Sequence, residues 1–238
     1  MSADDTRRAE LAANLARVRA RIDAARTAAG RTDEVTLVAV TKTYPATDVA
    51  LLADLGVTDV GENRDQEAAP KAAAIGGRVR WHFVGQLQRN KARSVTAYAD
   101  VVQSVDSVRL AAALDRGAAG HGRVVDVLIQ VSLDGDPERG GALPGSADPD
   151  RGLGPAAEAV AGAPALRLAG LMAVAPLGAP PDAAFAQLAE VAAAFHVDHP
   201  TATVLSAGMS DDLESAVSHG ATHVRVGSAL LGKRHYLG

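Results

Sequence analysis

Short runs of apolar and β-branched residues alternate with stretches of helical period along almost the whole chain after residue 30. A strand that lies between helical segments pairs in parallel with its neighbours, so this alternation restricts the fold more than any other feature. The strand-like runs cover residues 35–41, 59–62, 79–84, 100–104, 124–132, 166–173, 203–205 and 223–226. The helix-like runs cover residues 46–55, 64–74, 90–97, 108–119, 155–161, 182–197 and 211–218.

Eight such repeats in 238 residues predict an α/β fold, a single (β/α)8 TIM barrel, because that barrel takes about 250 residues. An open, doubly wound parallel sheet is the alternative. No shift in composition marks a second domain, so we expect residues 1–238 to form one domain. Residues 4–29 have apolar side chains at helical spacing and predict an extra N-terminal helix within residues 1–30, ended by Gly30. The Gly-, Pro- and Asp-rich segment 134–154 predicts a flexible loop.

The charge balance and the residue usage exclude several kinds of partner. A net charge of −4 gives no electrostatic basis for binding nucleic acid or an anionic membrane. No stretch reaches about 18 uninterrupted apolar residues, and the N-terminus mixes acids with arginines, so neither a membrane span nor a signal peptide is expected. The sequence has no cysteine, which excludes disulfides and fits a cytoplasmic protein. The pairs His196/His199 and His219/His223 lack a completing carboxylate or thiolate, so we expect no metal site.

One lysine closes a buried strand. The run VTLVAVTK at residues 35–42 has no helical period and is followed by Tyr44-Pro45, as expected of a strand buried on both faces. Lys42 therefore stands at a carboxyl strand end, where α/β barrels and open sheets bind ligands. Of the other lysines, Lys71 and Lys91 lie in polar helical stretches and Lys233 is near the terminus. Burial lowers the pKa of a lysine, and the neutral amine is a nucleophile.

Two glycine- and hydroxyl-containing turns follow the seventh and eighth strands. They read Ser206-Ala207-Gly208-Met209-Ser210 and Gly227-Ser228, and each precedes a short helical run. Glycine lets the backbone approach a ligand, and the loops after strands seven and eight of such barrels are a recurring phosphate site. Asp211 and Asp212 would repel a phosphate, so we expect both to face solvent. Taken alone, Ser206-x-Gly-x-Ser210 is also typical of a plain helix N-cap.

A strand-end lysine together with a phosphate-binding turn suggests pyridoxal 5′-phosphate (PLP), whose aldehyde forms a Schiff base with lysine. Arg225 supports this interpretation. If it faces the pyridine nitrogen it can only donate a hydrogen bond, which leaves that nitrogen unprotonated and the ring a weak electron sink. The alternatives are that Arg225 is an ion-pair partner and that His82 is a hydrogen-bonded core histidine.

The sequence resembles the pyridoxal phosphate homeostasis proteins, relatives of the alanine racemase barrel. The matching segments, in the family's order, are LVAVTKTYP (37–45), VGENRDQEA (60–68), WHFVGQLQRNK (81–91), SVDS (104–107), GLMAV (170–174), LSAGMSDDLESAV (205–217) and VRVGSALLGKR (224–234). The resemblance implies a monomeric or weakly associating PLP-binding TIM barrel.

The resemblance also implies a role for each residue of the predicted site. Lys42 is similar to the Schiff-base lysine and Asn63 to the residue beside the ring, while His82 and Met172 resemble pocket wall. Ser206, Ser210, Gly227 and Ser228 resemble phosphate ligands, with Met209 in the same turn, and Arg225 resembles the partner of the pyridine nitrogen.

The resemblance implies a non-catalytic role: holding PLP, and keeping PLP and amino/keto-acid pools balanced, with PLP-requiring apoenzymes as candidate recipients. The alternative is a PLP enzyme such as an amino-acid racemase. Racemases of this fold take a second acid/base, a tyrosine, from an extra β-domain of a partner subunit. The chain ends soon after the eighth repeat, so we expect no such domain, and its tyrosines are Tyr44, Tyr98 and Tyr236. An aldolase-type barrel that uses a lysine without PLP lacks a nearby carboxylate pair.

Overall fold

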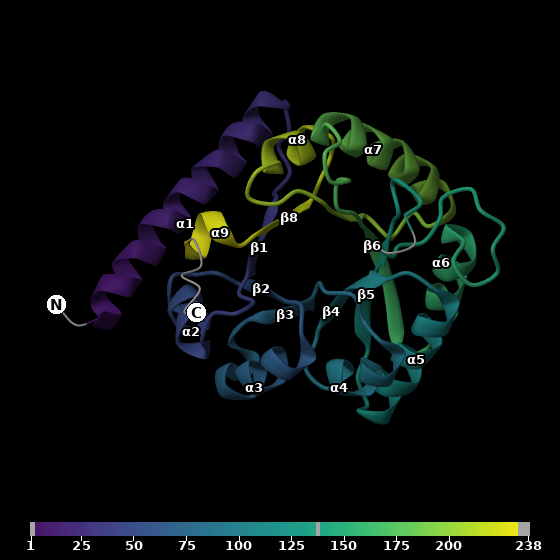
Figure 1. Ribbon diagram of the computed structural model, residues 1–238, viewed down its shortest axis with the longest axis horizontal. Helices are drawn as coiled ribbons and strands as arrows, with labels where there is room; N and C mark the ends of the chain where they lie inside the picture. The colour runs from purple at the N-terminus through teal and green to yellow at the C-terminus, as the bar shows by residue number, and fades with distance from the viewer. Residues whose placement is uncertain (1–2, 137–138, 233–238) are drawn as a thin grey trace.

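The computed structural model describes residues 3–136 and 139–232 and contains a closed barrel of eight parallel strands in sequential order, which confirms the predicted TIM barrel over the open sheet (Figure 1). Strand β8 pairs with β1 and closes the ring. Every predicted strand is present within one or two residues of its expected ends. The strands are β1 (Thr36–Val40), β2 (Asp59–Glu62), β3 (Arg80–Phe83), β4 (Val101–Val105), β5 (Val125–Gln130), β6 (Leu166–Met172), β7 (Val204–Ser206) and β8 (His223–Val226).

Helices form an outer ring around the strands (Figure 1). They are α1 (Ala3–Ala28), α2 (Ala46–Asp54), α3 (Asp65–Ile75), α4 (Ala92–Thr96), α5 (Val108–Gly120), α6 (Leu153–Ala161), α7 (Pro181–Asp198), α8 (Leu213–Ser218) and α9 (Ser228–Leu231). Two predicted helices differ in detail. The helix expected at 90–97 is a 3₁₀ turn, Arg89–Lys91, followed by the short α4, and the helix expected at 211–218 begins at Leu213. No helix of the described ranges is long and apolar enough to span a membrane.

Helix α1 lies across the seam where β8 meets β1, beside α8 and α9 (Figure 1). Its predicted apolar stripe, made of Leu11, Leu15, Val18 and Ile22, is buried. The stripe packs into a hydrophobic cluster with residues of β1, β2, β8 and α9. Polar side chains fix its position along the seam. Arg7 donates to the Asp48 carboxylate of α2 at 2.6 Å, and Asn14 donates to the Leu230 carbonyl of α9 at 2.9 Å.

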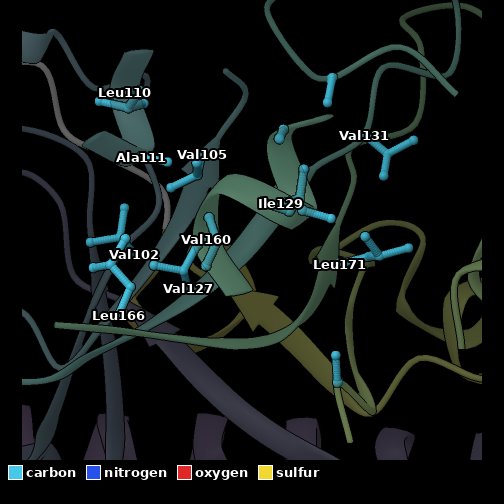
Figure 2. Packing of buried hydrophobic residues seen from close by; sticks show 14 of the residues in the cluster. Val102, Val105, Leu110, Ala111, Val127, Ile129, Val131, Val160, Leu166 and Leu171 are labelled. Carbon is cyan, nitrogen blue, oxygen red and sulfur yellow. The ribbon is translucent and has the colours of Figure 1, made fainter. Parts of the chain in front are cut away.

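A second apolar layer lies between the strands and helices on the other side of the barrel. Figure 2 shows its packing, in which residues of β4, β5 and β6 meet residues of α5 and α6; the labelled side chains are Val102, Val105, Leu110, Ala111, Val127, Ile129, Val131, Val160, Leu166 and Leu171. Because side chains alternate along a strand, the outward residues form this layer and the residues between them fill the barrel interior.

The barrel interior has an apolar part and a polar part. Val101, Leu128 and Met172 form a small apolar cluster contributed by β4, β5 and β6. The polar part consists of buried residues at inward positions: Asp59, His82, Gln103, Asp126, Ser206 and Arg225. A barrel interior of this kind is packed solid, so these polar groups must satisfy one another or face a ligand.

The described part of the segment 134–154 is tied to the barrel by hydrogen bonds. Short parallel bridges join Val131 to Ala142 and Leu143 to Gly152, and Ala142 is fully buried. Arg139 donates to the carbonyl of Ala175 at 3.0 Å, beyond the end of β6. Residues 137 and 138 lie outside the described residues, and the predicted flexibility of this loop stays a prediction.

Candidate functional site

A cavity of about 430 Å³ opens among the loops that follow the carboxyl ends of the strands, the end at which TIM barrels bind their ligands. It gathers residues that are far apart in the sequence, from the ends of six strands and the loops after them. Eight of the ten residues predicted for the site are among its lining. The lining residues are Val40, Lys42, Tyr44, Asn63, Val84, Gly85, Met172, Val174, Met209, Ser210, Asp211, Arg225, Gly227, Ser228 and Gly232.

Lys42 is half-buried directly after β1, and helix α3 holds the backbone on both sides of it. Lys71 Nζ donates to the Thr41 carbonyl at 2.9 Å, and Glu67 Oε2 accepts the Thr43 N–H at 3.0 Å. Thr43 has a φ of 71°, a left-handed conformation that a β-branched residue adopts only when its surroundings impose it. Because Glu67 and Lys71 are one helical turn apart, they present both contacts from one face of α3.

The Lys71 ammonium is buried, which the sequence did not suggest for a polar helical stretch. Its Nζ lies 2.7 Å from Glu62 Oε1, which also accepts the Thr41 hydroxyl at 2.6 Å. Glu62 is 1% exposed, and its Oε2 has no hydrogen-bond partner among the described residues. Burial raises the pKa of Glu62, against the opposing effects of Lys71 and Thr41. The pair therefore holds the end of β1 at the cost of placing two charges in the interior.

Asn63 is held at the cavity edge by a close backbone contact with Gly85. A Cβ atom on residue 85 would lie 2.2 Å from the Asn63 carbonyl oxygen, a distance that no side chain permits. Glycine is therefore required at this position so that the chain after β3 can pass the chain after β2.

The turns after β7 and β8 contact each other at the cavity. Ser210 Oγ accepts the Ala229 N–H at 3.3 Å, and the Ser210 carbonyl accepts Arg21 of α1 at 2.9 Å. Asp212 was also expected to face solvent but is half-buried, because its Oδ1 turns inward to accept the Met209 N–H at 2.5 Å. Asp211 is exposed, as expected, but it also lines the mouth of the cavity.

Arg225 is 4% exposed and forms part of the cavity wall. Its guanidinium donates to Ser206 Oγ at 2.8 Å and to the Ala173 carbonyl at 2.9 Å. Burial lowers the pKa of Arg225 to about 10, which still leaves the group protonated at neutral pH. The side chain presents a fixed positive donor to whatever occupies the cavity.

The structure does not bring Ser206 and His82 to this cavity. Ser206 is fully buried, and its Oγ donates to Gln103 Oε1 at 2.8 Å while accepting from Arg225. Both of its hydrogen-bonding capacities are used inside the barrel, so Ser206 supports Arg225 where a phosphate ligand was expected. His82 opens onto a separate cavity of about 290 Å³ that Arg80 and Asp126 also line. His82 is the hydrogen-bonded core histidine of the alternative interpretation. The alternation of side chains along a strand predicts that Ser206 and His82 face the barrel interior. It does not predict how far each one lies from the carboxyl end of the barrel.

Tyr44 lines the cavity and donates its hydroxyl to the Gly232 carbonyl at 2.8 Å, so it ties the loop after β1 to the end of α9. Tyr98 lies instead on the outer side of the barrel, in a hollow between α3 and α4. Tyr236 lies outside the described residues.

We expect the stability of the protein to depend on pH through His223, which lines the same cavity as His82. Burial lowers the pKa of His223 to about 4, whereas the unfolded side chain titrates near 6.5. Between these values the unfolded chain binds more protons, so the free energy of unfolding should fall as the pH falls from 6.5 to 4, by at most about 1.4 kcal/mol per pH unit. Urea unfolding of His223→Gln should lack this contribution. Exposed His121→Gln is the control, and parallel pH curves for His223→Gln and wild type would contradict the prediction.

Comparison with known proteins places the chain among PLP-related barrels. The family model of the alanine racemase N-terminal domain matches residues 13–235. The pyridoxal phosphate homeostasis protein of Mycobacterium leprae is 45% identical, over 95% of this chain and 93% of the relative, and that of Escherichia coli is 37% identical, over 95% and 98%. The solved structure of PipY from Synechococcus elongatus with PLP bound superimposes with a TM-score of 0.77 at 34% identity, over 93% of this chain and all of that one.

Proposed function

The chain belongs to the family of pyridoxal phosphate homeostasis proteins, which share the barrel of the alanine racemase N-terminal domain, and on this premise we propose that it binds PLP in the cavity of Lys42. It holds PLP covalently through Lys42 and helps maintain intracellular PLP and amino/keto-acid homeostasis. The observation that carries the proposal is that Lys42, Arg225 and the Ser210 and Ser228 hydroxyls line one cavity. The PLP-bound structure of a relative 34% identical supports it.

The chemistry of the lining fits PLP. When bound, PLP supplies an electrophilic aldehyde and a dianionic phosphate. Lys42 provides the amine, and the Ser210 and Ser228 hydroxyls with the turn at Gly227 provide groups for the phosphate. Asp211 is exposed at the mouth, where solvent screens its charge.

Each remaining lining residue of the predicted set has a proposed role. Arg225 would donate to the pyridine nitrogen from a fixed position. Asn63 and Met172 would hold the ring from the cavity wall. Met209, which is 40% exposed, covers the phosphate turn and limits access of water.

We propose that the protein does not turn over amino acids. Two-base racemisation needs a second acid/base opposite the lysine, and Tyr44, the one tyrosine in the described lining of the cavity, already donates its hydroxyl to Gly232. Tyr44 is also the feature that favours the alternative, a PLP-dependent racemase, because it is within the cavity. Incubating PLP-loaded protein with L-alanine, L-serine and L-glutamate should give less than one D-amino acid per site. Sustained multiple turnover would show an enzyme.

The covalent site can be tested directly. Protein loaded with PLP should be yellow, and borohydride reduction followed by proteolysis and mass spectrometry should place one phosphopyridoxyl group on the peptide that contains Lys42. A label on Lys71 or Lys91, or none at all, would refute the proposed site. Dialysis before the reduction removes free PLP, so that label at the cavity can be distinguished from nonspecific label on surface lysines.

A further inference from the structure

Five buried side chains from five different strands form one continuous series of hydrogen bonds through the barrel interior. Arg225 of β8 contacts Ser206 of β7, which contacts Gln103 of β4, which contacts His82 of β3, which contacts Asp59 of β2. Each of the four contacts has a heavy-atom distance of 2.8 Å. The series begins at the wall of the Lys42 cavity and ends in the polar region at the opposite end of the barrel.

The chemistry of the two ends gives the series a direction. A guanidinium can only donate and a carboxylate can only accept, so Arg225 donates to Ser206 Oγ. The Ser206 hydroxyl donates in turn to Gln103 Oε1, and Gln103 Nε2 donates to His82 Nδ1. His82 must then carry its proton on Nε2 and donate it to Asp59 Oδ1. Hydrogen bonds that all run in one direction polarise one another.

Burial makes the series an all-or-none arrangement. Its members are at most 7% exposed: Asp59 7%, His82 2%, Gln103 0%, Ser206 0% and Arg225 4%. A break at any position would leave buried donors or acceptors unpaired. Burial alone would raise the pKa of Asp59, but hydrogen bonds from His82 and Thr58 hold it below its usual value. Asp59 therefore stays ionised, and its charge opposes that of Arg225 across the interior.

We propose that Asp59, His82 and Gln103 are positioning residues that act through Ser206 to fix the Arg225 guanidinium at the PLP cavity. The inference rests on the proposed function, since it assigns these residues to the binding of the same cofactor. Because its single proton is committed to Gln103, Ser206 is held as a hydrogen-bond acceptor toward Arg225. Residues at the far end of the barrel thus set the position and the electrostatic environment of the donor that faces the cofactor.

Two variants interrupt the series in different ways. Asp59→Asn removes the terminal charge and keeps the shape, and Gln103→Met removes the central link and keeps the length. Asp126→Asn is the matched control, because Asp126 lies on the inward side of β5 at the same end of the barrel, where it pairs with Arg80 and Arg167 and not with the series. The release rate of PLP and the absorbance maximum of bound PLP are measured for each, with the Lys42 label as a check of loading.

Both variants should release PLP about tenfold faster and shift the absorbance maximum, while Asp126→Asn should match wild type in both readouts. Wild-type values for Asp59→Asn and Gln103→Met, or equal changes in Asp126→Asn, would overturn the inference.

A second measurement needs neither variant nor cofactor. In wild-type protein labelled with ¹⁵N-histidine, nuclear magnetic resonance should show His82 as the neutral tautomer protonated on Nε2, and protonation on Nδ1 would overturn the inference. This measurement still decides the matter if a variant fails to fold. Absence of any Lys42 label in wild-type protein would refute the proposed function, and the His82 tautomer would continue to test the series itself.

Discussion

Replacing Lys42 by alanine is expected to abolish the borohydride-stable phosphopyridoxyl group and the visible absorbance of the loaded protein. The covalent bond has no other donor in the cavity, because Lys42 is the only lysine in its described lining. The fold should persist. Lys42 is half-buried, and the contacts that fix this part of the chain use the backbone of Thr41 and Thr43. We expect the melting temperature to change by at most about 2–4 °C, the shift that 1 kcal/mol produces in a chain of this size.

Lys91→Ala is the matched control for this variant. The Lys91 side chain is 38% exposed and its Nζ lies 4.0 Å from Asp65, so its removal should leave both the label and the spectrum unchanged. Mass spectrometry of the reduced proteins and a thermal melt measure both quantities. Global unfolding of Lys42→Ala would show that the lysine is structural, and a persistent label would show that another residue binds the cofactor.

Lys71→Met should lower the free energy of unfolding by about 3–5 kcal/mol, the usual cost of removing one partner from a buried ion pair. Methionine has nearly the length of the lysine stem, so the loss comes from Glu62, whose carboxylate would remain 1% exposed without a cation. This is a large share of the 5–15 kcal/mol typical of folded domains. Equilibrium unfolding in urea, followed by circular dichroism, measures the change.

Repeating the urea unfolding of Lys71→Met at several pH values tests the explanation for its lost stability. Burial already raises the pKa of Glu62, and loss of Lys71 should raise it further. The folded variant then takes up a proton more readily than the unfolded chain, so the deficit relative to wild type should shrink as the pH falls toward 5.

The double variant Glu62→Gln/Lys71→Met should recover much of the lost stability, because positions 62 and 71 then carry no buried charge. Lys91→Met removes a partly exposed lysine whose Nζ lies 4.0 Å from Asp65, and this change should cost at most about 1 kcal/mol. Equal costs for Lys71→Met and Lys91→Met would contradict the importance of the buried pair.

The fold could be predicted because its signals are local. Each β-branched run and each helical period is visible within a dozen residues, and eight repeats of this kind leave few topologies. The ends of the predicted strands bring Lys42, Asn63, Ser210 and Gly227 to one face of the barrel, and all four line the cavity.

The predictions for Ser206 and Lys71 differ from the structure because they depend on how deep a side chain lies and which way it faces. Sequence spacing gives the direction of a side chain only in part and does not give its depth. Ser206 and Arg225 both point into the barrel, but the cavity ends at Arg225. Ser206 lies deeper and contacts Gln103, which is 103 positions earlier in the chain than Ser206. The helical pattern around Lys71 is polar, so it does not predict that this lysine is buried. Glu67 and Lys71 share a face of α3 that is turned toward the end of β1, and only the packing of that helix shows this.

The position of α1 across the barrel seam has a consequence for synthesis. The Arg7 side chain contacts the Leu231 carbonyl 224 positions later, and Asn14 contacts Leu230 216 positions later. A ribosome that adds about 5–20 residues per second needs about 10–45 s to supply these partners. During that time the part of the apolar stripe of α1 that α8 and α9 finally cover is exposed on the nascent chain. We therefore expect the newborn protein to be most prone to aggregate, and most dependent on chaperones, before its eighth repeat emerges.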